Sequence, residues 1–312
     1  MKQICFFLST TAIIFLSACQ KDFTVDNVFP LSNAALTDSN FLDKIYLTRT
    51  SGTLTDTVFT QFYSYDNNRR IISFYIPDGP ATGPLSGERI RFFYAGSDTF
   101  PARSEEVFYR TSGPNDTLVT FFSFSAAGQR IRDSALYFWH EEISPGILHN
   151  FMYKKIIAYE YLPGKIYAKT LETQLQDDSP IPYIGLLFTY SDTATRDANN
   201  NIISHTQWKS YFNLDIIVSS SVFTYDANPN PFKKNGFYKG VSIFPNGCET
   251  FLEYMASTNN RLHALEGNGS GGVCSDEDFT NKYTYNAAGF PKQITYLNGS
   301  STEKIIFVYR TL

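Results

Sequence analysis

The chain has few of the residues that most often carry chemistry. Its 312 residues include 4 histidines, 4 cysteines, 3 methionines and 2 tryptophans. No serine is flanked as in a nucleophile elbow, so nothing supports a serine hydrolase triad. The lysines and arginines are dispersed along a chain of formal net charge -4. A concentrated basic surface is needed to bind phosphates, so a nucleic-acid partner is disfavoured. We predict no cofactor and no resident metal.

Aromatic side chains are abundant instead. The 28 phenylalanines and 21 tyrosines, together with frequent Ile, Val and Thr, favour strands over helices. Strand-like runs follow one another at even spacing and are joined by Gly, Pro, Asn and Asp, which is typical of an antiparallel meander. We therefore predict an all-β protein whose successive hairpins form a large curled sheet, a partly closed barrel or a sandwich, with at most one or two short helices.

The predicted strands are short and regularly spaced. They cover residues 44–49, 57–65, 70–76, 89–94, 103–110, 117–124, 130–139, 151–161, 166–171, 183–190, 202–212, 216–225, 237–244, 282–285, 292–297 and 304–309. Residues 249–257 break this pattern, because three large apolar side chains recur there at helical spacing. That segment is the best helix candidate after the first nineteen residues.

A short phrase recurs along the chain, in which two strand-like runs flank a turn. It occurs at residues 63–71, 122–131 and 283–294, and in distorted form at 223–229. The first turn position holds Asp, Asn or Ser, whose side chain can bond to backbone amides two residues on, and Gly or Asn at the fourth tolerates positive φ. The phrase therefore predicts hairpins closed by type I turns, with Gly289 at positive φ. Residues 197–201 are interpreted as another such turn.

The turn also predicts a register. If Asn286 to Gly289 form the loop, Tyr285 faces Phe290 and Asn281 faces Ile294. The same rule places residues 66–69 in the first loop. It then collects on one face a mainly apolar set: Phe59, Tyr63, Tyr65, Ile72, Phe74 and Ile76. A slip by one residue would scatter this face.

The N-terminus is typical of an exported protein. Lys2 supplies the positive charge of a signal peptide and residues 4–16 its apolar core, and residues 16–19 resemble the lipobox of bacterial lipoproteins. In that interpretation residues 1–19 are a signal and Cys19 carries lipid; the alternative is an ordinary secretory signal with an incidental cysteine. We predict a flexible tether over residues 20–41 and an all-β domain over residues 42–312.

Two further cysteines remain, Cys248 and Cys274. In an exported, oxidising setting they are expected to form a disulfide, which would stabilise the fold by roughly 3 to 4 kcal/mol on the chain-entropy estimate. The alternatives are two free thiols or a metal pair, and no nearby second cysteine pair supports zinc.

Few residues are candidates for a functional site. The densest group of His and carboxylate residues is His140, Glu141, Glu142 and His149. On a strand His140 and Glu142 share a face and could ligate a metal, but a solvated strand end is the favoured interpretation. Adjacent carboxylates point to opposite faces of a strand, so a glycosidase acid pair would need two distant strands. Trp139 and Trp208 are the candidate ligand-binding residues, as platforms for a bound molecule.

The combined motifs resemble a family. The lipobox, the Tyr-x-Tyr-Asp hairpins, residues 225–232 followed later by residues 257–260, and the hairpin at 283–291 look like a group of secreted lipoproteins of Bacteroidota. The turn phrase resembles, distantly, the tyrosine-aspartate repeats of RHS proteins. Gln20, Lys21 and Asp22 resemble the start of the signal that exports such lipoproteins to the cell surface. No activity is established for this group, so the resemblance implies location and fold rather than mechanism.

Two classes of function follow from these observations. The first is a lipid-anchored binding module of the outer membrane, facing the cell surface or the periplasm, whose ligand is a glycan or another envelope protein. The second is an envelope hydrolase acting on polysaccharide through a carboxylate pair that the sequence does not identify. A structural spacer is a third possibility.

Overall fold

The chain folds almost entirely into antiparallel strands, as predicted. The computed structural model describes residues 40–51, 53–77, 87–96, 98–109, 114–126, 128–144, 146–178, 185–211, 214–234, 257–268, 277–298 and 301–312. The first seven strands are β1 (Phe41–Ser51), β2 (Leu54–Tyr65), β3 (Ile71–Pro77), β4 (Gly87–Tyr94), β5 (Pro101–Tyr109), β6 (Asp116–Phe124) and β7 (Arg130–Ser144). Five more strands follow: β8 (Ile147–Leu162), β9 (Lys165–Asp177), β10 (Gly185–Arg196), β11 (Ile202–Tyr211) and β12 (Leu214–Pro229). After the helical turn α2 (Pro231–Lys234) come β13 (Asn259–Asn268), β14 (Glu277–Thr280), β15 (Lys282–Tyr285), β16 (Pro291–Asn298) and β17 (Ser301–Arg310).

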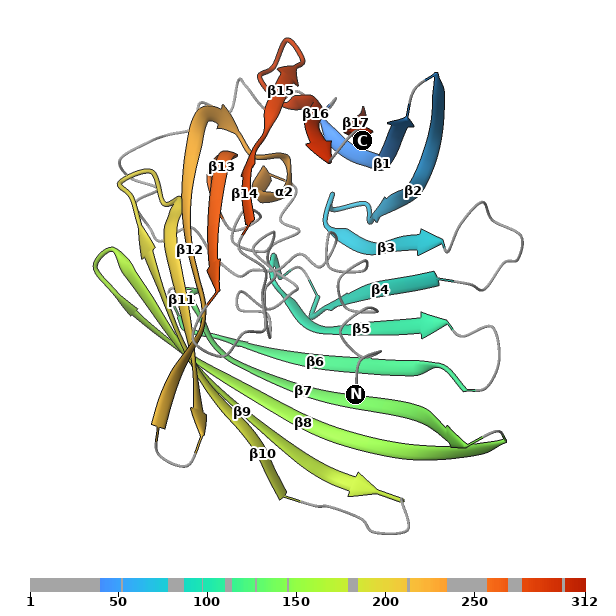
Figure 1. Cartoon of the computed structure of the whole chain (residues 1–312), viewed down its shortest axis with the longest axis vertical. Coiled ribbons are helices and arrows are strands. Elements are labelled where there is room, and N and C mark those ends of the chain that lie inside the picture. The colour runs from blue at the N-terminus through green and yellow to red at the C-terminus, as the bar shows by residue number, and fades with distance from the viewer. Residues whose placement is uncertain are drawn as a thin grey trace.

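The strands form one sheet that curls into a nearly closed ring (Figure 1). Consecutive strands pair from β1 through to β14, and again from β15 through to β17. Strand β17 also pairs with β1. Between β14 and β15 stands only Asn281, so these two short strands act as one that joins β13 to β16. The sheet is therefore barrel-like rather than a sandwich. In the described part of the chain, no helix is long and apolar enough to cross a membrane.

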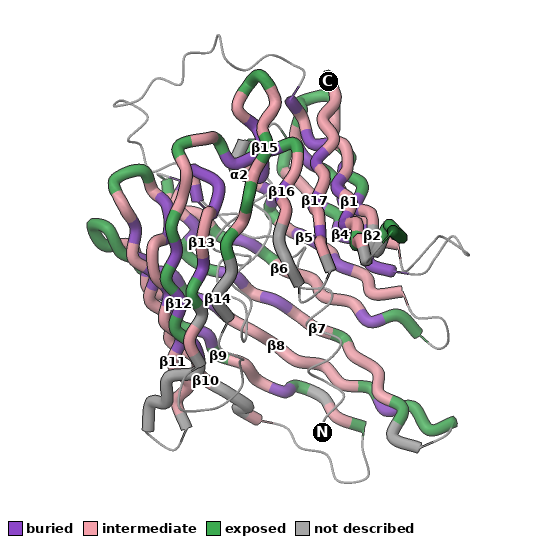
Figure 2. The backbone as a smooth tube through the Cα atoms, turned by 45° about the horizontal axis from the view of Figure 1, so that its top comes forward, coloured by how far each residue is buried: buried purple, intermediate pink, exposed green. Residues whose placement is uncertain are grey.

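The main apolar core lies on the inner face of the ring. Buried and more exposed residues alternate along most strands (Figure 2), as expected when one face is covered. Phe232 of α2 is only 1% exposed, and its ring lies 6.1 Å from that of Phe307 on β17. Phe232 belongs to a buried cluster whose other residues come from six strands. They are Leu42, Ile45, Leu47, Tyr63, Ile71, Phe74, Ile76, Ile90, Phe92, Ile294, Ile305 and Phe307. A smaller cluster on β8 to β13 contains Ile157, Tyr159, Ile166, Ala168, Ala194, Ile202, Phe223 and Ala264.

Four hairpins share one turn geometry. In the first, the Asp66 amide donates to the Arg70 carbonyl oxygen and the Arg69 amide to the Asp66 carbonyl oxygen, both at 2.9 Å. The turns that begin at Ser125, Asp197 and Asn286 repeat both bonds. This is a type I turn followed by a bulge residue in the left-handed conformation.

Side chains reinforce these turns as the sequence predicts. The Asp66 Oδ1 atom accepts from the amides of Asn68 and Arg70, each at 2.9 Å. The fourth turn residue has positive φ in every copy, at 62° in Arg69, 63° in Asn200 and 82° in Gly289 among them. The predictions of positive φ at Gly289 and of a turn at residues 197–201 are confirmed.

The predicted register is wrong by two residues. Tyr283 lies opposite Ile294, where Asn281 was expected, because the turn closes with a pair between Asn286 and Phe290 and a bulge follows it. An even shift leaves each residue on its face, so Tyr283 and Ile294 still point inward. The exception is Ile72. It is the extra residue of the bulge and is 36% exposed, whereas Ile71 is buried in its place.

Tyrosine hydroxyls tie neighbouring strands together beside these turns. Near the end of β2, the Tyr65 hydroxyl donates to the Leu42 carbonyl oxygen at 2.9 Å. The same contact recurs from Tyr94 to Ile71 at 2.8 Å, from Tyr225 to Ile202 at 2.6 Å and from Tyr309 to Pro291 at 2.7 Å. A hydrogen bond of this kind contributes about 1 kcal/mol net. These four tyrosines link neighbouring strands at one end of the ring, which we call the turn end.

The distorted copy of the phrase is the same turn with a long insertion. The Asp226 Oδ1 atom accepts from the amide of Asn228 at 2.9 Å and from that of Asn260 at 3.0 Å. Asn260 therefore takes the place that Arg70 has in the first turn. The chain leaves this split turn after Asn228, forms α2 and returns at β13, a strand that the sequence analysis missed. The predicted strand at 237–244 and nearly all of the helix at 249–257 lie outside the described residues.

Candidate functional site

A group of aromatic side chains covers the inner face of β5, β7 and β8. We call it the aromatic wall, and it consists of Phe108, Tyr137, Trp139, Phe151 and Tyr153. Tyr137 lies directly opposite Tyr153, and Trp139 opposite Phe151, on the paired strands β7 and β8. Alternation along β7 from the buried Asp133 and Ala135 shows that Tyr137 and Trp139 face the interior.

The rings of the wall form a contiguous ladder. The Trp139 ring centroid lies 5.8 Å from that of Phe151, 6.1 Å from that of Tyr153 and 6.4 Å from that of Tyr137. The planes of Phe151 and Tyr153 differ by 22°, as do those of Tyr137 and Trp139. All five rings are half-buried, whereas the aromatic residues of the main core are almost fully buried. The wall therefore keeps part of its ring surface open to the interior.

Carboxylates surround Tyr153 at the centre of the wall. Burial, aided by the nearby charges of Asp177, Glu141 and Glu172, raises the pKa of Tyr153 to about 12. Its hydroxyl is thus a neutral hydrogen-bond donor at physiological pH. Rings combined with fixed carboxylates suit a ligand that has both apolar faces and hydrogen-bonding groups.

Basic residues stand on the side of the wall nearer the turn end. Lys155 lies directly opposite Glu172 on the β8–β9 pair. The Lys209 ammonium lies 5.7 Å from the centroid of the Tyr190 ring, and burial lowers the pKa of Lys209 while Glu172 opposes that shift. Glu172 is therefore surrounded by positive charge.

The opposite side of the wall, which we call its far side, is acidic. Glu141 lies opposite His149 on the β7–β8 pair, and Asp177 opposite Phe151 on the β8–β9 pair. His149 Nδ1 lies 3.5 Å from Asp178 Oδ1, and the Asn150 amide, which donates to Asp178, lowers the pKa of that carboxyl. Glu141 has no hydrogen-bond or ion-pair partner among the described residues.

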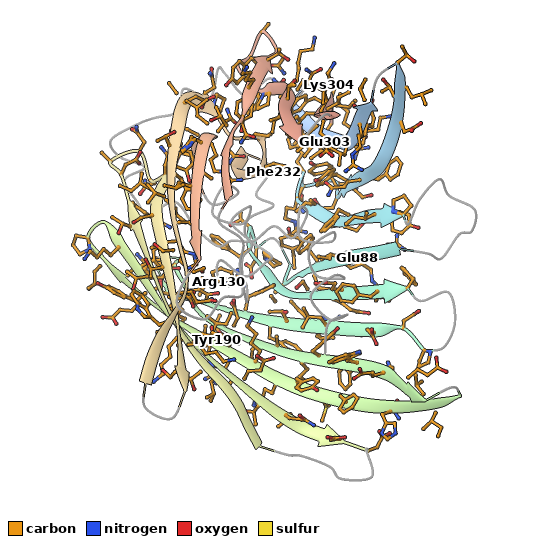
Figure 3. All side chains as sticks on the ribbon, in the orientation of Figure 1. Glu88, Arg130, Tyr190, Phe232, Glu303 and Lys304 are labelled. Carbon is orange, nitrogen blue, oxygen red and sulfur yellow. The ribbon has the colours of Figure 1, made fainter. Side chains whose placement is uncertain are left out.

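Beyond the wall, the interior is polar and densely bonded. The fully buried Arg130 donates to Asp133, and the Tyr159 hydroxyl donates to the same carboxylate at 2.6 Å. On β10 and β11, Asp192 accepts from His205 at 3.1 Å and from Gln207 at 2.8 Å. Figure 3 labels Arg130 on β7, Tyr190 on β10 and Phe232 of α2. The hydrogen bonds to Asp133 link β7 to β8, and those to Asp192 link β10 to β11.

The structure separates the two candidate tryptophans. Trp139 belongs to the aromatic wall. Trp208 on β11 follows the buried Gln207 and lies opposite Ser191 and Ile217, so it stands on the outer face of the ring. The two residues cannot contribute to one site.

The other candidates are placed as follows. His140 Nδ1 lies 3.1 Å from Asp116 Oδ1, whereas the buried His149 approaches Asp178, so the two histidines have different partners. No group of three or more metal-ligand side chains lies close together in the described part of the chain. Cys19, Cys248 and Cys274 lie outside the described residues.

Sequence reasoning missed four members of the wall. Tyr137 and Phe151 stand two residues from Trp139 and Tyr153 on their strands, which is the spacing of residues that share a face. That spacing was available in the sequence. The pairing of the two strands was not, because it depends on the connection between Ser144 and Ile147, which carries no turn phrase.

Comparisons with known proteins reveal the fold but no family. No protein-family model and no curated protein matches the chain. The structure is similar to that of a porin-like protein from Bacteroides vulgatus ATCC 8482, with 14% sequence identity and a TM-score of 0.50, over 88% of this chain and 100% of that one. A porin-like protein from Bacteroides uniformis ATCC 8492 is 11% identical with a TM-score of 0.34, over 86% of this chain and 98% of that one. The first of these similarities supports the curled antiparallel sheet alone.

Proposed function

We propose that the protein is a cell-envelope binding module that holds a glycan against the aromatic wall. The observation that carries this proposal is the ladder of five half-buried rings on the inner face, which the packing of the core does not require. Aromatic rings bind the apolar faces of sugars, and the surrounding carboxylates can accept hydrogen bonds from sugar hydroxyls. Trp139, whose ring contacts three others, is the central contact residue.

The two tryptophans provide the test. In the variant Trp208→Phe, Trp139 is the one remaining indole, so its fluorescence reports on the wall. We expect titration with a panel of soluble polysaccharides to change this fluorescence in a saturable way. In the matched variant Trp139→Phe the same titration should leave the Trp208 signal unchanged.

Binding measured by calorimetry completes the experiment. Stacking of a nucleobase on one aromatic ring contributes on the order of 1 to 3 kcal/mol. If a sugar stacks with similar energy, Trp139→Ala should weaken binding by roughly 5- to 150-fold while Trp208→Ala does not. Equal effects of both substitutions, or no polysaccharide bound by the wild-type protein, would contradict the proposal. In the second case an envelope protein would become the ligand to seek.

We further propose that the module is tethered to the outer membrane by lipid on Cys19, at the cell surface or facing the periplasm. Support comes from the signal-like residues 1–18 and the lipobox that ends at Cys19. Expression with a radiolabelled fatty acid, followed by fractionation, should label the wild-type protein and retain it in the membrane. Cys19→Ala should be unlabelled and soluble; continued labelling of that variant would reject the anchor.

A further inference from the structure

The charges around the aromatic wall are arranged unevenly. On the side of the turn end, Lys155 and Lys209 stand near Glu172. On β7, the next inward-facing residue after Trp139 is Glu141. On β9, Asp177 lies opposite Phe151 of β8. The far side of the wall therefore combines aromatic rings with acidic groups.

This combination favours a positively charged group on the ligand. A cation near an aromatic face is attracted by the negative charge of the π-system, and a carboxylate beside the ring strengthens the attraction. Glu141 is half-buried and has no partner among the described residues, so it is placed to pair with a ligand without first breaking a bond of its own. The histidine opposite Glu141, His149, approaches Asp178 instead.

We propose that the wall selects saccharides with free amino groups, with the protonated amine bound between Glu141 and the rings of Trp139 and Phe151. This inference rests on the proposed glycan function and adds the class of glycan. A neutral sugar offers the Glu141 carboxylate only neutral hydroxyl and amide donors, whereas an amino sugar supplies a charge-assisted donor.

Two ligands that differ in one group test the inference. Oligomers of glucosamine carry free amines, and oligomers of N-acetylglucosamine of the same length carry neutral amides. Calorimetric titration of the full mature chain, at a pH where the amine is protonated, should give at least about tenfold tighter binding of the amine, equivalent to about 1.4 kcal/mol.

Protein variants locate the selectivity. Glu141→Gln keeps the shape of the side chain and removes its charge, so we expect it to weaken binding of the amine oligomer more than that of the acetylated oligomer, and the preference for the amine to disappear. Glu160→Gln is the matched control, because Glu160 is an exposed glutamate on β8, away from the wall. It should retain the full preference.

The outcomes separate the two proposals. If both oligomers bind equally and Trp139→Ala weakens both, the amine inference is wrong and the glycan-binding wall stands. If binding is unaffected by Trp139→Ala, both proposals are wrong. If neither oligomer binds, the amine inference is overturned, and the wall is then judged by the polysaccharide panel alone.

Discussion

The two halves of strand β8 face the same interior but have different neighbours. Near the turn end, Ile157 and Tyr159 are buried in a packed cluster with β9, β10 and β12. Further from the turn end, Phe151 and Tyr153 belong to the aromatic wall, and their rings are half-buried. One strand thus serves packing along one half and offers a surface along the other. On the proposed function, stability and binding occupy separate parts of the same sheet.

At the turn end, the insertion of the split turn packs against the main apolar core. Phe232 enters the main core from the insertion of the split turn, and Tyr285 and Asn260 bond to Asp226 beside it. The wall has no equivalent insertion among the described residues. Substitutions at the turn end should therefore affect folding, and substitutions in the wall should affect binding.

The largest effect on stability is expected from Phe232→Ala. Removing a buried phenylalanine side chain from a core costs roughly 3 to 5 kcal/mol, because apolar contacts are lost and a cavity remains. Denaturant unfolding followed by circular dichroism measures it. Phe121→Ala is the control, since Phe121 is 48% exposed, and it should cost less than about 1 kcal/mol. Equal losses in the two variants would show that α2 does not pack as described.

The predicted disulfide between Cys248 and Cys274 should contribute next. By sequence position it would tie the insertion of the split turn to the connection between β13 and β14. We expect the double variant Cys248→Ser, Cys274→Ser to lose roughly 3 to 4 kcal/mol. Thiol titration of the denatured, unreduced mature protein checks the premise. Two reactive thiols would mean that the pair is open.

The split turn should matter more than an ordinary one. Asp226→Ala removes the acceptor for Asn228, Asn260 and Tyr285, and it leaves buried donors without partners. We expect a loss of roughly 2 to 3 kcal/mol. Asp66→Ala removes the same carboxylate from a continuous and more exposed turn and should cost about 1 kcal/mol. A larger loss for Asp66→Ala would contradict the split-turn interpretation.

The smallest of these effects concerns the last hairpin. At Gly289, φ is 82°, which a β-branched residue rarely adopts, so Gly289→Val should cost roughly 1 to 2 kcal/mol. Gly289→Asn should be milder, because Asn200 has a φ of 63° at the equivalent position. Equal melting temperatures for the two variants would argue against the turn assignment.

The sequence predicted the turn end well because its determinants are local. The Asp, Asn or Ser at the first turn position bonds to backbone amides within four residues, and the alternation beside the turn selects a buried face. The register was wrong for two reasons. The turn closes with a pair between Asn286 and Phe290, and the further bulge after it has no signature in side-chain type. Strand β13 was missed because Asn259 and Asn260, at its start, are polar residues that serve the split turn.

Of the five residues of the aromatic wall, the sequence analysis predicted only Trp139. The reason differs from the one that explains the wrong register. Period-two spacing shows which residues share a face, but it does not show which face becomes the inside of a ring. That depends on closure of the sheet, in which β1 pairs with β17 at the other end of the described chain. By residue type, Trp208 is as good a candidate for ligand binding as Trp139. Only the curling of the sheet into a ring places Trp208 on the outer face.

A single variant measured in two ways tests the separation of packing from binding. We predict that the free energy of unfolding of Trp139→Ala, from denaturant titration, lies within about 1 kcal/mol of that of the wild-type protein. The variant should bind the polysaccharide identified by the panel roughly 5- to 150-fold more weakly. The opposite result, a loss of several kcal/mol in stability with unchanged polysaccharide affinity, would show that the aromatic wall is part of the core and would contradict this account.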